Sequence, residues 1–138
     1  MAHLYRVLVP VTDIDRAQTF YSQVLGSPGR RVSPGRHYFD CEGTILACFD
    51  PSADGDGYTA TPNPEALYFA VSDLPAAFEA CRAAGAQFAE GSPPGVGPLG
   101  EIGQRPWGEE SFYVRDPFGN SLCFVSRSSV FTGEGEKS

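Results

Sequence analysis

The stretches Val-Thr-Asp-Ile at residues 11–14 and Val-Ser-Asp-Leu at residues 71–74 decide the fold, because they repeat one signal 60 residues apart. In each stretch, the apolar end of a strand is followed by an aspartate that can cap a helix. An apolar stripe with helical spacing follows each aspartate, and Gly26 and Gly85 then end the two helices. The repeat predicts two similar halves in one chain.

Outward from the first signal, short strands follow the helix and turn residues separate them. Ser-Pro-Gly at residues 33–35 and Glu-Gly at residues 42–43 mark two tight turns. The first half is therefore predicted to have the order β-α-β-β-β. Its four strands are expected at residues 3–10, 30–33, 36–41 and 44–49.

The second half shows the same order after its own strand and helix. Its last two strands form a hairpin around Asp-Pro-Phe-Gly-Asn at residues 116–120, which is strong turn chemistry. A long loop rich in glycine and proline precedes this hairpin, at residues 91–106. The four strands of this half are expected at residues 66–71, 87–90, 111–115 and 121–126.

We therefore predict an α+β fold in one domain over residues 1–127. Two tandem βαβββ modules, residues 3–50 and 65–127, are expected to form a curved mixed sheet that lines a cleft. A polar linker joins them at residues 51–64, and residues 128–138 form a polar C-terminal tail. The place where the halves face each other is the expected ligand site.

Composition limits the classes of function. The chain has 138 residues, 41% of them hydrophobic, which is enough for one ordinary core. A net charge of −7 repels phosphate backbones and anionic lipids, so neither a nucleic acid nor a membrane surface is an expected partner. No apolar run approaches the roughly 18 residues of a membrane helix, and no signal peptide is apparent, so a cytoplasmic protein is expected. Four cysteines without a CxxC pair indicate reduced thiols.

The motifs at residues 13–26, 71–74, 107–108 and 115–120 together resemble the vicinal oxygen chelate superfamily of glyoxalases, extradiol dioxygenases and bleomycin-resistance proteins. The resemblance covers nearly the whole chain. Trp-Gly a few residues before Asp-Pro-x-Gly-Asn is most similar to the metal-free branch of bleomycin-resistance proteins. That resemblance implies a homodimer that holds a planar or aromatic small molecule between its subunits.

The resemblance also implies four positions for metal ligands, two in each half. These positions hold Arg6, Ala47, Ala66 and Cys123 in this chain. None is a histidine or a carboxylate, and a divalent ion needs several nitrogen or oxygen donors. We therefore expect no bound metal and no other cofactor.

Arg6 is the first candidate for ligand binding. It stands on an otherwise apolar strand, where an unpaired guanidinium is costly to bury. It could clamp a carboxylate or carbonyl of the ligand, form an internal ion pair, or lie at an exposed edge.

Aromatic side chains are the second group of candidates. Trp107, the only tryptophan, could stack on a planar ligand or plug the core over the hairpin. Strand alternation places Leu8, Phe49 and Tyr68 on the same face as Arg6, with Phe49 and Tyr68 as stacking walls, although Phe49 could equally serve packing.

Three further side chains are expected near the cleft. His37 could accept a proton from a ligand, or be an ordinary surface residue. Tyr113 could donate a hydrogen bond. Cys123 is a nucleophile on paper, but no histidine is placed to activate it, which favours an inert buried thiol.

Three hypotheses follow. The favoured one is a metal-free binding protein that sequesters an aromatic or peptide-like antibiotic or a similar metabolite. The alternative is a glyoxalase-like or dioxygenase-like enzyme, in which Arg6 polarises an oxygen and His37 or Tyr113 moves a proton. The third is a structural module whose cleft is filled by side chains.

Overall fold

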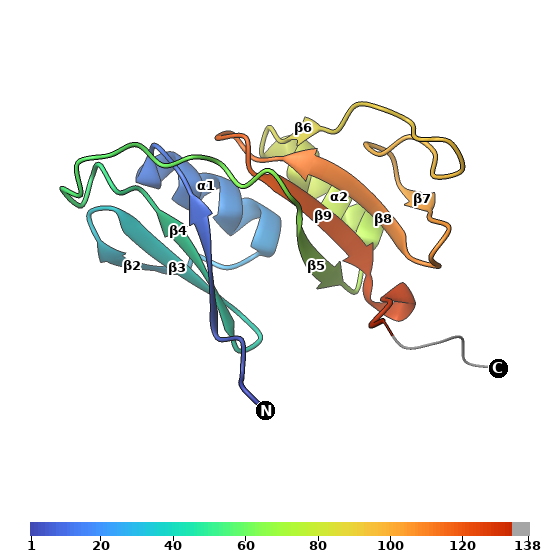
Figure 1. The fold of residues 1–138 in the computed structure, drawn as a ribbon, viewed down its shortest axis with the longest axis horizontal. Coiled ribbons are helices and arrows are strands. Elements are labelled where there is room, and N and C mark those ends of the chain that lie inside the picture. Colours follow the sequence, from blue (N-terminus) through green and yellow to red (C-terminus); the bar gives the residue numbers. More distant parts are fainter. Residues whose placement is uncertain (134–138) are drawn as a thin grey trace.

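The computed structural model describes residues 1–133 and contains two β-sheets backed by two helices (Figure 1). The first half comprises β1 (Arg6–Pro10), α1 (Ile14–Leu25), β2 (Arg30–Ser33), β3 (Arg36–Cys41) and β4 (Thr44–Phe49). The second half comprises β5 (Leu67–Val71), α2 (Leu74–Ala83), β6 (Gln87–Phe88), β7 (Gly103–Gln104), β8 (Glu110–Arg115) and β9 (Ser121–Ser126). A short 3₁₀ turn, Arg127–Ser129, follows β9.

Both helices begin at the aspartates that the repeat predicted. The Asp13 carboxylate accepts a hydrogen bond from the Arg16 backbone N–H at 3.1 Å, and Asp73 accepts from the Ala76 N–H at 3.0 Å. Gly26 ends α1 with a left-handed φ of 72°, a conformation that favours glycine. The expected starts of both helices and the end of α1 are thus confirmed, while α2 ends at Ala83 with Ala84 as its C-cap, just before Gly85.

The strands form two separate sheets, in the orders β1-β4-β3-β2 and β5-β9-β8-β6, with β7 beside β8. Each half thus has its own sheet, and within residues 1–133 the two sheets do not join into one continuous curved sheet. The physical reason lies at the outer edge of β1, where one side chain of the linker and one of the second half take the place of a strand. The Asn63 amide donates to the Leu8 carbonyl at 3.0 Å, and the Asn120 amide donates to the Pro10 carbonyl at 2.7 Å.

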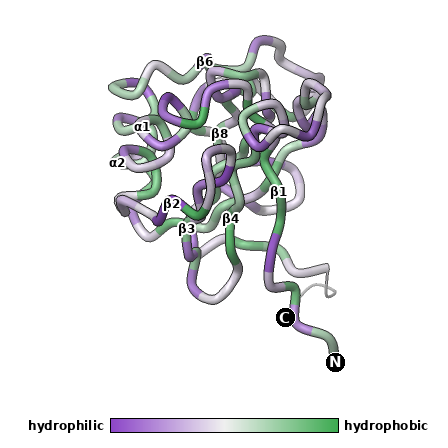
Figure 2. The backbone as a smooth tube through the Cα atoms, turned by 90° about the vertical axis from the view of Figure 1, so that its left-hand side faces the viewer, coloured by the Kyte–Doolittle hydropathy of each residue, from purple (hydrophilic) through white to green (hydrophobic). Residues whose placement is uncertain are grey.

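Both helices lie on the same side of the two sheets, as Figures 1 and 2 show from two directions. Their apolar stripes and the facing sides of the sheets form one shared core. The largest contributions come from Phe20, Tyr21, Phe39, Leu46, Phe112, Leu122 and Phe124. No α-helix of residues 1–133 covers the opposite side of either sheet, and we call these two surfaces the open faces.

Two parts of the chain differ from expectation. Strand β7 lies inside the loop that was predicted to have no regular structure. Residues 128–133, assigned to the polar tail, return to the second sheet, where the Phe131 backbone N–H donates to Glu109 at 2.8 Å. Residues 134–138 of that tail lie outside the described part. Among residues 1–133, no helix has the length and apolar character needed to cross a membrane.

Candidate ligand-binding site

The open faces collect most of the side chains that the sequence nominated. On the first sheet, strand register sets Arg6 beside Ile45, Leu8 beside Ala47, and Phe49 beside Pro10. On the second sheet, Tyr68, Cys123 and Tyr113 form one row across β5, β9 and β8. Alternation of side chains along a strand therefore predicted the correct face for these residues.

His37 lies on the other face of its sheet, against α1 and the core. It pairs with Cys48, whose side chain points to the helix, and it is only 2% exposed. Its Nδ1 accepts from Arg31 at 3.3 Å, so the proton on Nε2 donates to the Pro28 carbonyl at 2.9 Å. The expectation that His37 reaches the ligand is corrected here, because its neighbour Tyr38 occupies the open face.

Arg6 is exposed at the edge of the first open face and meets two phenols. Its guanidinium donates to the Tyr38 hydroxyl at 3.3 Å and to the Tyr5 hydroxyl at 3.2 Å. It also lies 5.1 Å from the centre of the Tyr5 ring and 5.9 Å from that of Tyr38. Within residues 1–133, Arg6 forms no ion pair.

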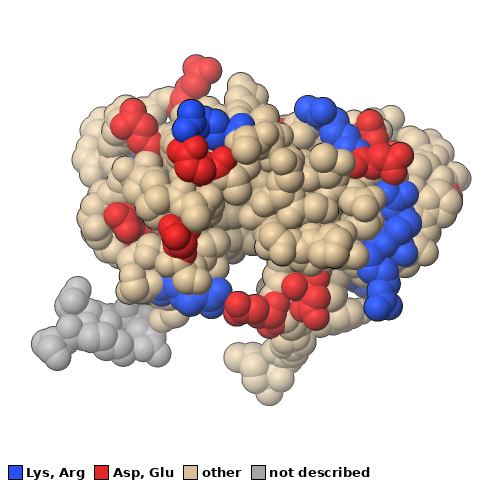
Figure 3. Space-filling model, turned by 180° about the vertical axis from the view of Figure 1, so that it is seen from behind, with Lys and Arg blue, Asp and Glu red and all other residues tan. Residues whose placement is uncertain are grey.

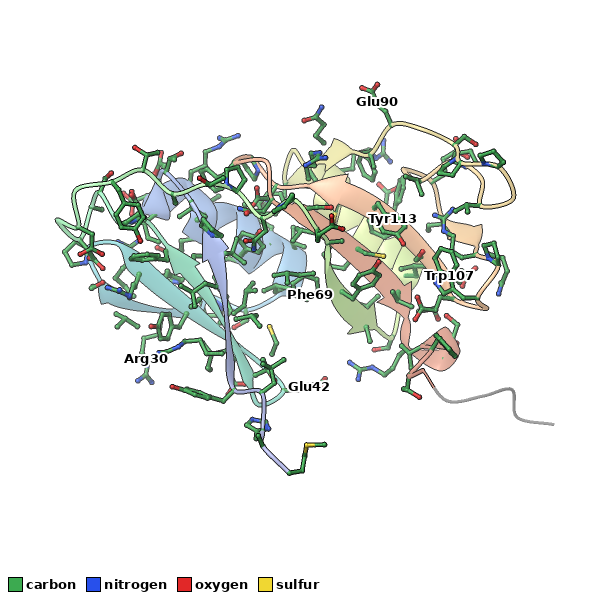
Figure 4. The ribbon with its side chains drawn as sticks, viewed as in Figure 1. Arg30, Glu42, Phe69, Glu90, Trp107 and Tyr113 are labelled. Carbon is green, nitrogen blue, oxygen red and sulfur yellow. The ribbon has the colours of Figure 1, made fainter. Side chains whose placement is uncertain are left out.

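A pocket of about 400 Å³ opens on the second sheet. Figure 4 shows Trp107 and Tyr113 along this sheet, with Trp107 near the beginning of β8. Trp107 is 42% exposed, so it does not plug the core and its ring is available to a ligand. The walls are Tyr68, Phe69, Ala70, Trp107, Glu109, Val125, Val130 and Phe131.

Glu109 gives this pocket its electrostatic character. Its buried carboxylate accepts the Trp107 indole N–H at 2.9 Å and the Phe131 backbone N–H at 2.8 Å. No described cation lies within ion-pair distance of it. A partly desolvated carboxylate beside aromatic rings favours a cationic group in the pocket.

Cys123 and Tyr113 are protonated at neutral pH. Burial raises the pKa of the Cys123 thiol to about 11. Burial also raises the pKa of Tyr113, and contact with the Tyr68 hydroxyl, 3.5 Å away, acts in the same direction. A thiol that keeps its proton is a poor nucleophile, so this row can pack and donate hydrogen bonds.

The four positions that the resemblance assigned to metal ligands do not fit a divalent ion. They present a guanidinium, two methyl groups and a thiol whose pKa lies well above neutral. Over residues 1–133, no three side chains of His, Cys, Asp or Glu gather in a geometry that could hold a metal.

Arg105 is a buried residue that the sequence analysis missed. Its guanidinium, 2% exposed, donates to the Ser111 hydroxyl at 3.0 Å and to several backbone carbonyls. The carbonyls belong to Val96, Pro98, Leu99, Glu101 and Ser111. The long loop before β8 is thereby fastened beside Tyr113. Nothing local marks such an arginine, because its partners are carbonyls of a loop without periodicity.

The turn at residues 116–120 joins the two halves, which the sequence analysis also missed. The Tyr21 hydroxyl on α1 donates to the Asp116 carboxylate at 2.6 Å. The Asn120 amide N–H donates to both Asp116 and the Pro10 carbonyl, and the Asn120 amide oxygen accepts from the Asn63 N–H at 2.7 Å. All of Tyr21, Asp116 and Asn120 are buried.

A second, larger cavity of about 850 Å³ lies between the two halves. Apolar side chains from both halves line it, and Figure 3 shows an opening at this place when the molecule is seen from the helix side. At its rim, Arg127 forms a two-pronged ion pair with Glu42 at 3.0 and 3.3 Å. Of the candidate residues, only Tyr68 reaches this cavity.

Comparison with known proteins agrees with this architecture. A family model described as the Glyoxalase/Bleomycin resistance protein/Dioxygenase superfamily matches residues 3–124. A glyoxalase/bleomycin resistance protein from Albidiferax ferrireducens T118 is 25% identical, with a TM-score of 0.67 and coverage of 88% of this chain and 96% of that one. No curated protein sequence gives a significant match.

Two further solved structures share the fold at lower identity. A glyoxalase-related enzyme from Fulvimarina pelagi has a TM-score of 0.68 at 19% identity, covering 91% of this chain and 88% of that one. A lactoylglutathione lyase from Agrobacterium tumefaciens has a TM-score of 0.64 at 19% identity, covering 91% of this chain and 94% of that one. At these identities the likeness extends to the fold alone.

Proposed function

This chain belongs to the Glyoxalase/Bleomycin resistance protein/Dioxygenase superfamily, and we propose that it binds a small aromatic molecule without a metal ion. The observation that carries the proposal is the pocket on the second open face. Its aromatic walls, Tyr68, Trp107 and Phe131, surround the buried carboxylate of Glu109. In this proposal the protein resembles the bleomycin-resistance branch and acts by sequestering its ligand.

The energetics of such a pocket favour a planar ligand with a cationic group. Stacking on an indole contributes about 0.5–1.5 kcal/mol beyond the burial of apolar area. A cation over aromatic rings adds roughly 0.5–2 kcal/mol, and more when it is shielded from water. The Glu109 carboxylate is already held in place by two N–H donors, so it need not reorganise when the ligand binds.

A homodimer forms part of the proposal. The open faces leave large apolar side chains in contact with solvent, and contiguous exposed apolar surface is typical of an interaction site. The side chains concerned are all more than 40% exposed, namely Tyr5, Leu8, Tyr68, Trp107 and Phe131. We propose that the two tandem βαβββ modules of one chain face those of a second chain, so that the open faces together line the ligand cleft.

Titration of Trp107 fluorescence tests the function directly, because Trp107 is the only tryptophan. We expect saturable quenching by members of a panel of planar aromatic antibiotics that carry an amine. Elemental mass spectrometry of the purified protein should show no stoichiometric metal. Absence of quenching by the whole panel, stoichiometric metal, or conversion of a panel compound to product would each contradict sequestration without a metal.

Glu109→Gln separates the contribution of charge from that of packing. The amide retains an oxygen that can accept the Trp107 N–H but loses the acceptor for the Phe131 backbone N–H, so a neutral isostere of the ligand is titrated in parallel to detect any change in the shape of the pocket. Removing the charge should lower the affinity for an amine-bearing quencher by about tenfold, the scale of one charge-assisted contact. The affinity for a neutral isostere should stay nearly unchanged. Tyr58→Ala, at an exposed aromatic residue outside the pocket, is the matched control and should alter neither affinity.

A further inference from the structure

Three hydrogen-bonding side chains converge on the first open face without a carboxylate among them. Arg6 lies on β1, Tyr38 lies on β3, and Tyr5 precedes β1. Both phenol oxygens accept from the guanidinium, at 3.3 Å for Tyr38 and 3.2 Å for Tyr5. A phenol that accepts in this way still has its own O–H to donate. The cluster therefore offers two free O–H donors next to a positive charge.

The charge of Arg6 is not neutralised by its neighbours. Asp40 lies in the same row across the sheet, paired through Ile45, yet no ion pair joins it to Arg6. The Asp40 carboxylate instead accepts from the Gly43 N–H at 2.8 Å. By contrast, Arg31 on β2 and Arg36 on β3 are each paired with an aspartate. Arg6 thus keeps a guanidinium that can meet an external anion.

The two tyrosine rings hold the guanidinium in place. Its carbon lies 5.1 Å and 5.9 Å from the two ring centres, within the range of cation–π contact. Restricting the side chain before the anion arrives lowers the entropy lost on binding. Arg6 also lies on the open face together with Leu8, so an anion bound there would be in contact with apolar surface.

We propose that Arg6, Tyr5 and Tyr38 form a carboxylate-binding site on the first open face. The inference rests on the proposed function in one respect: it assigns a carboxylate to the ligand whose aromatic part binds at Trp107. The ligand class is then an aromatic, peptide-like molecule with a cationic and an anionic group. The anion site itself can be tested without the rest of the ligand.

Benzoate is the probe, with benzyl alcohol as its uncharged counterpart. Titration of isotope-labelled protein, followed by nuclear magnetic resonance through the backbone N–H signals of β1 and, where Arg6 is present, its Nε–H signal, should show a saturable shift with benzoate and a much weaker one with benzyl alcohol. Benzoate binding should also weaken as salt is added, because an exposed ion pair is screened. Lack of a saturable shift with benzoate overturns the proposal.

Substitutions identify which groups bind the anion. Arg6→Met should lower the affinity for benzoate about tenfold, the scale of a charge-assisted hydrogen bond. Tyr38→Phe should lower it about threefold, the scale of a neutral hydrogen bond. Arg16→Met removes the same charge from an exposed position on α1, on the helix side of the sheets, and should change affinity by less than about twofold. Equal losses for Arg6→Met and Arg16→Met would show attraction by general charge, and would overturn the site.

The variant Trp107→Phe keeps this test separate from the proposed function. One outcome is that benzoate still binds to Trp107→Phe, while no compound of the aromatic panel quenches Trp107 fluorescence in the wild type. That outcome would support the anion site and reject the aromatic pocket. Quenching by the panel with no loss in Arg6→Met would do the reverse.

Discussion

The two halves of the chain are joined in opposite ways at the two ends of β1. Where β1 ends, Tyr21, Asp116 and Asn120 form a buried hydrogen-bonded cluster that reaches the Pro10 carbonyl. Near its beginning, the only contact of opposite charges between the halves in residues 1–133 is the Glu42–Arg127 pair, whose side chains are 75% and 51% exposed. The first junction is buried, and the second is largely exposed to solvent.

The difference shows which junction sets the geometry of the site. Buried polar groups must keep their partners, since an unsatisfied one costs about 1–3 kcal/mol. An exposed ion pair contributes roughly 0–1 kcal/mol and is weakened by salt. The cluster at the end of β1 therefore fixes how the open faces lie relative to each other, whereas the Glu42–Arg127 pair can open at little cost.

Breaking the buried junction should have the largest effect. Asn120→Ala removes the donor to the Pro10 carbonyl, the donor to Asp116 and the acceptor for Asn63 at once. We expect a loss of about 3 kcal/mol in the free energy of unfolding, measured by urea denaturation. Ser128→Ala, at an exposed position after β9, is a control that should change stability by less than about 0.5 kcal/mol. A loss in Asn120→Ala no larger than in this control would contradict the comparison.

Tyr21→Phe tests the same junction more gently. It deletes a single hydroxyl that donates to Asp116 at 2.6 Å and leaves the aromatic packing in place. The expected loss is about 2 kcal/mol, because a buried carboxylate loses one of its donors. Tyr113→Phe is the matched control, since its hydroxyl contacts the Tyr68 hydroxyl at 3.5 Å and the Cys123 thiol but no carboxylate of residues 1–133, and it should lose less.

Alkaline pH should weaken the buried junction and spare the exposed one. Burial, followed by the charge of Asp116, raises the pKa of Tyr21 above the ordinary value of 10. The folded protein therefore retains a proton that the unfolded chain releases, so this contribution is complete below pH 10 and declines as the pH rises above it. The measurement is the difference in unfolding free energy between wild type and Tyr21→Phe from pH 8 to 11. A difference that does not shrink above pH 10 would contradict the assignment.

Breaking the exposed junction should have the smallest effect on the free energy of unfolding. Glu42→Gln is expected to cost about 0.5 kcal/mol or less at low salt, and the loss should vanish in about 1 M salt because exposed charges are then screened. Arg127→Met should give a similar value, and the double variant should lose no more than either single variant. A cost above about 2 kcal/mol would show that both junctions fix the geometry.

Local pattern predicted the elements and the faces of the strands well. The repeated Asp at positions 13 and 73 marked both helix starts, and alternation placed Arg6, Tyr68 and Cys123 on the open faces. These features depend on residues within a few positions of each other, or on the two-residue period of a strand, so a sequence contains them fully.

His37 shows the limit of the same reasoning. The strand was predicted, but its residues were not assigned to faces, and the structure places Tyr38 on the open face and His37 on the side of the core. The partner strand decides this, because the register of β3 on β4 sets His37 beside Cys48 and turns both toward α1.

By itself the sequence determined the two helices with their caps, the strand order along the chain, the family resemblance and the poor metal-ligand set at Arg6, Ala47, Ala66 and Cys123. Only the tertiary structure decided that the sheets stay separate, that Asn120 joins the halves, that Arg105 fastens the long loop, and that Glu109 lies beneath Trp107. Caps and turns are set by neighbours in sequence. Burial and the partner of a polar group depend on residues tens of positions away, which come together only when the chain folds.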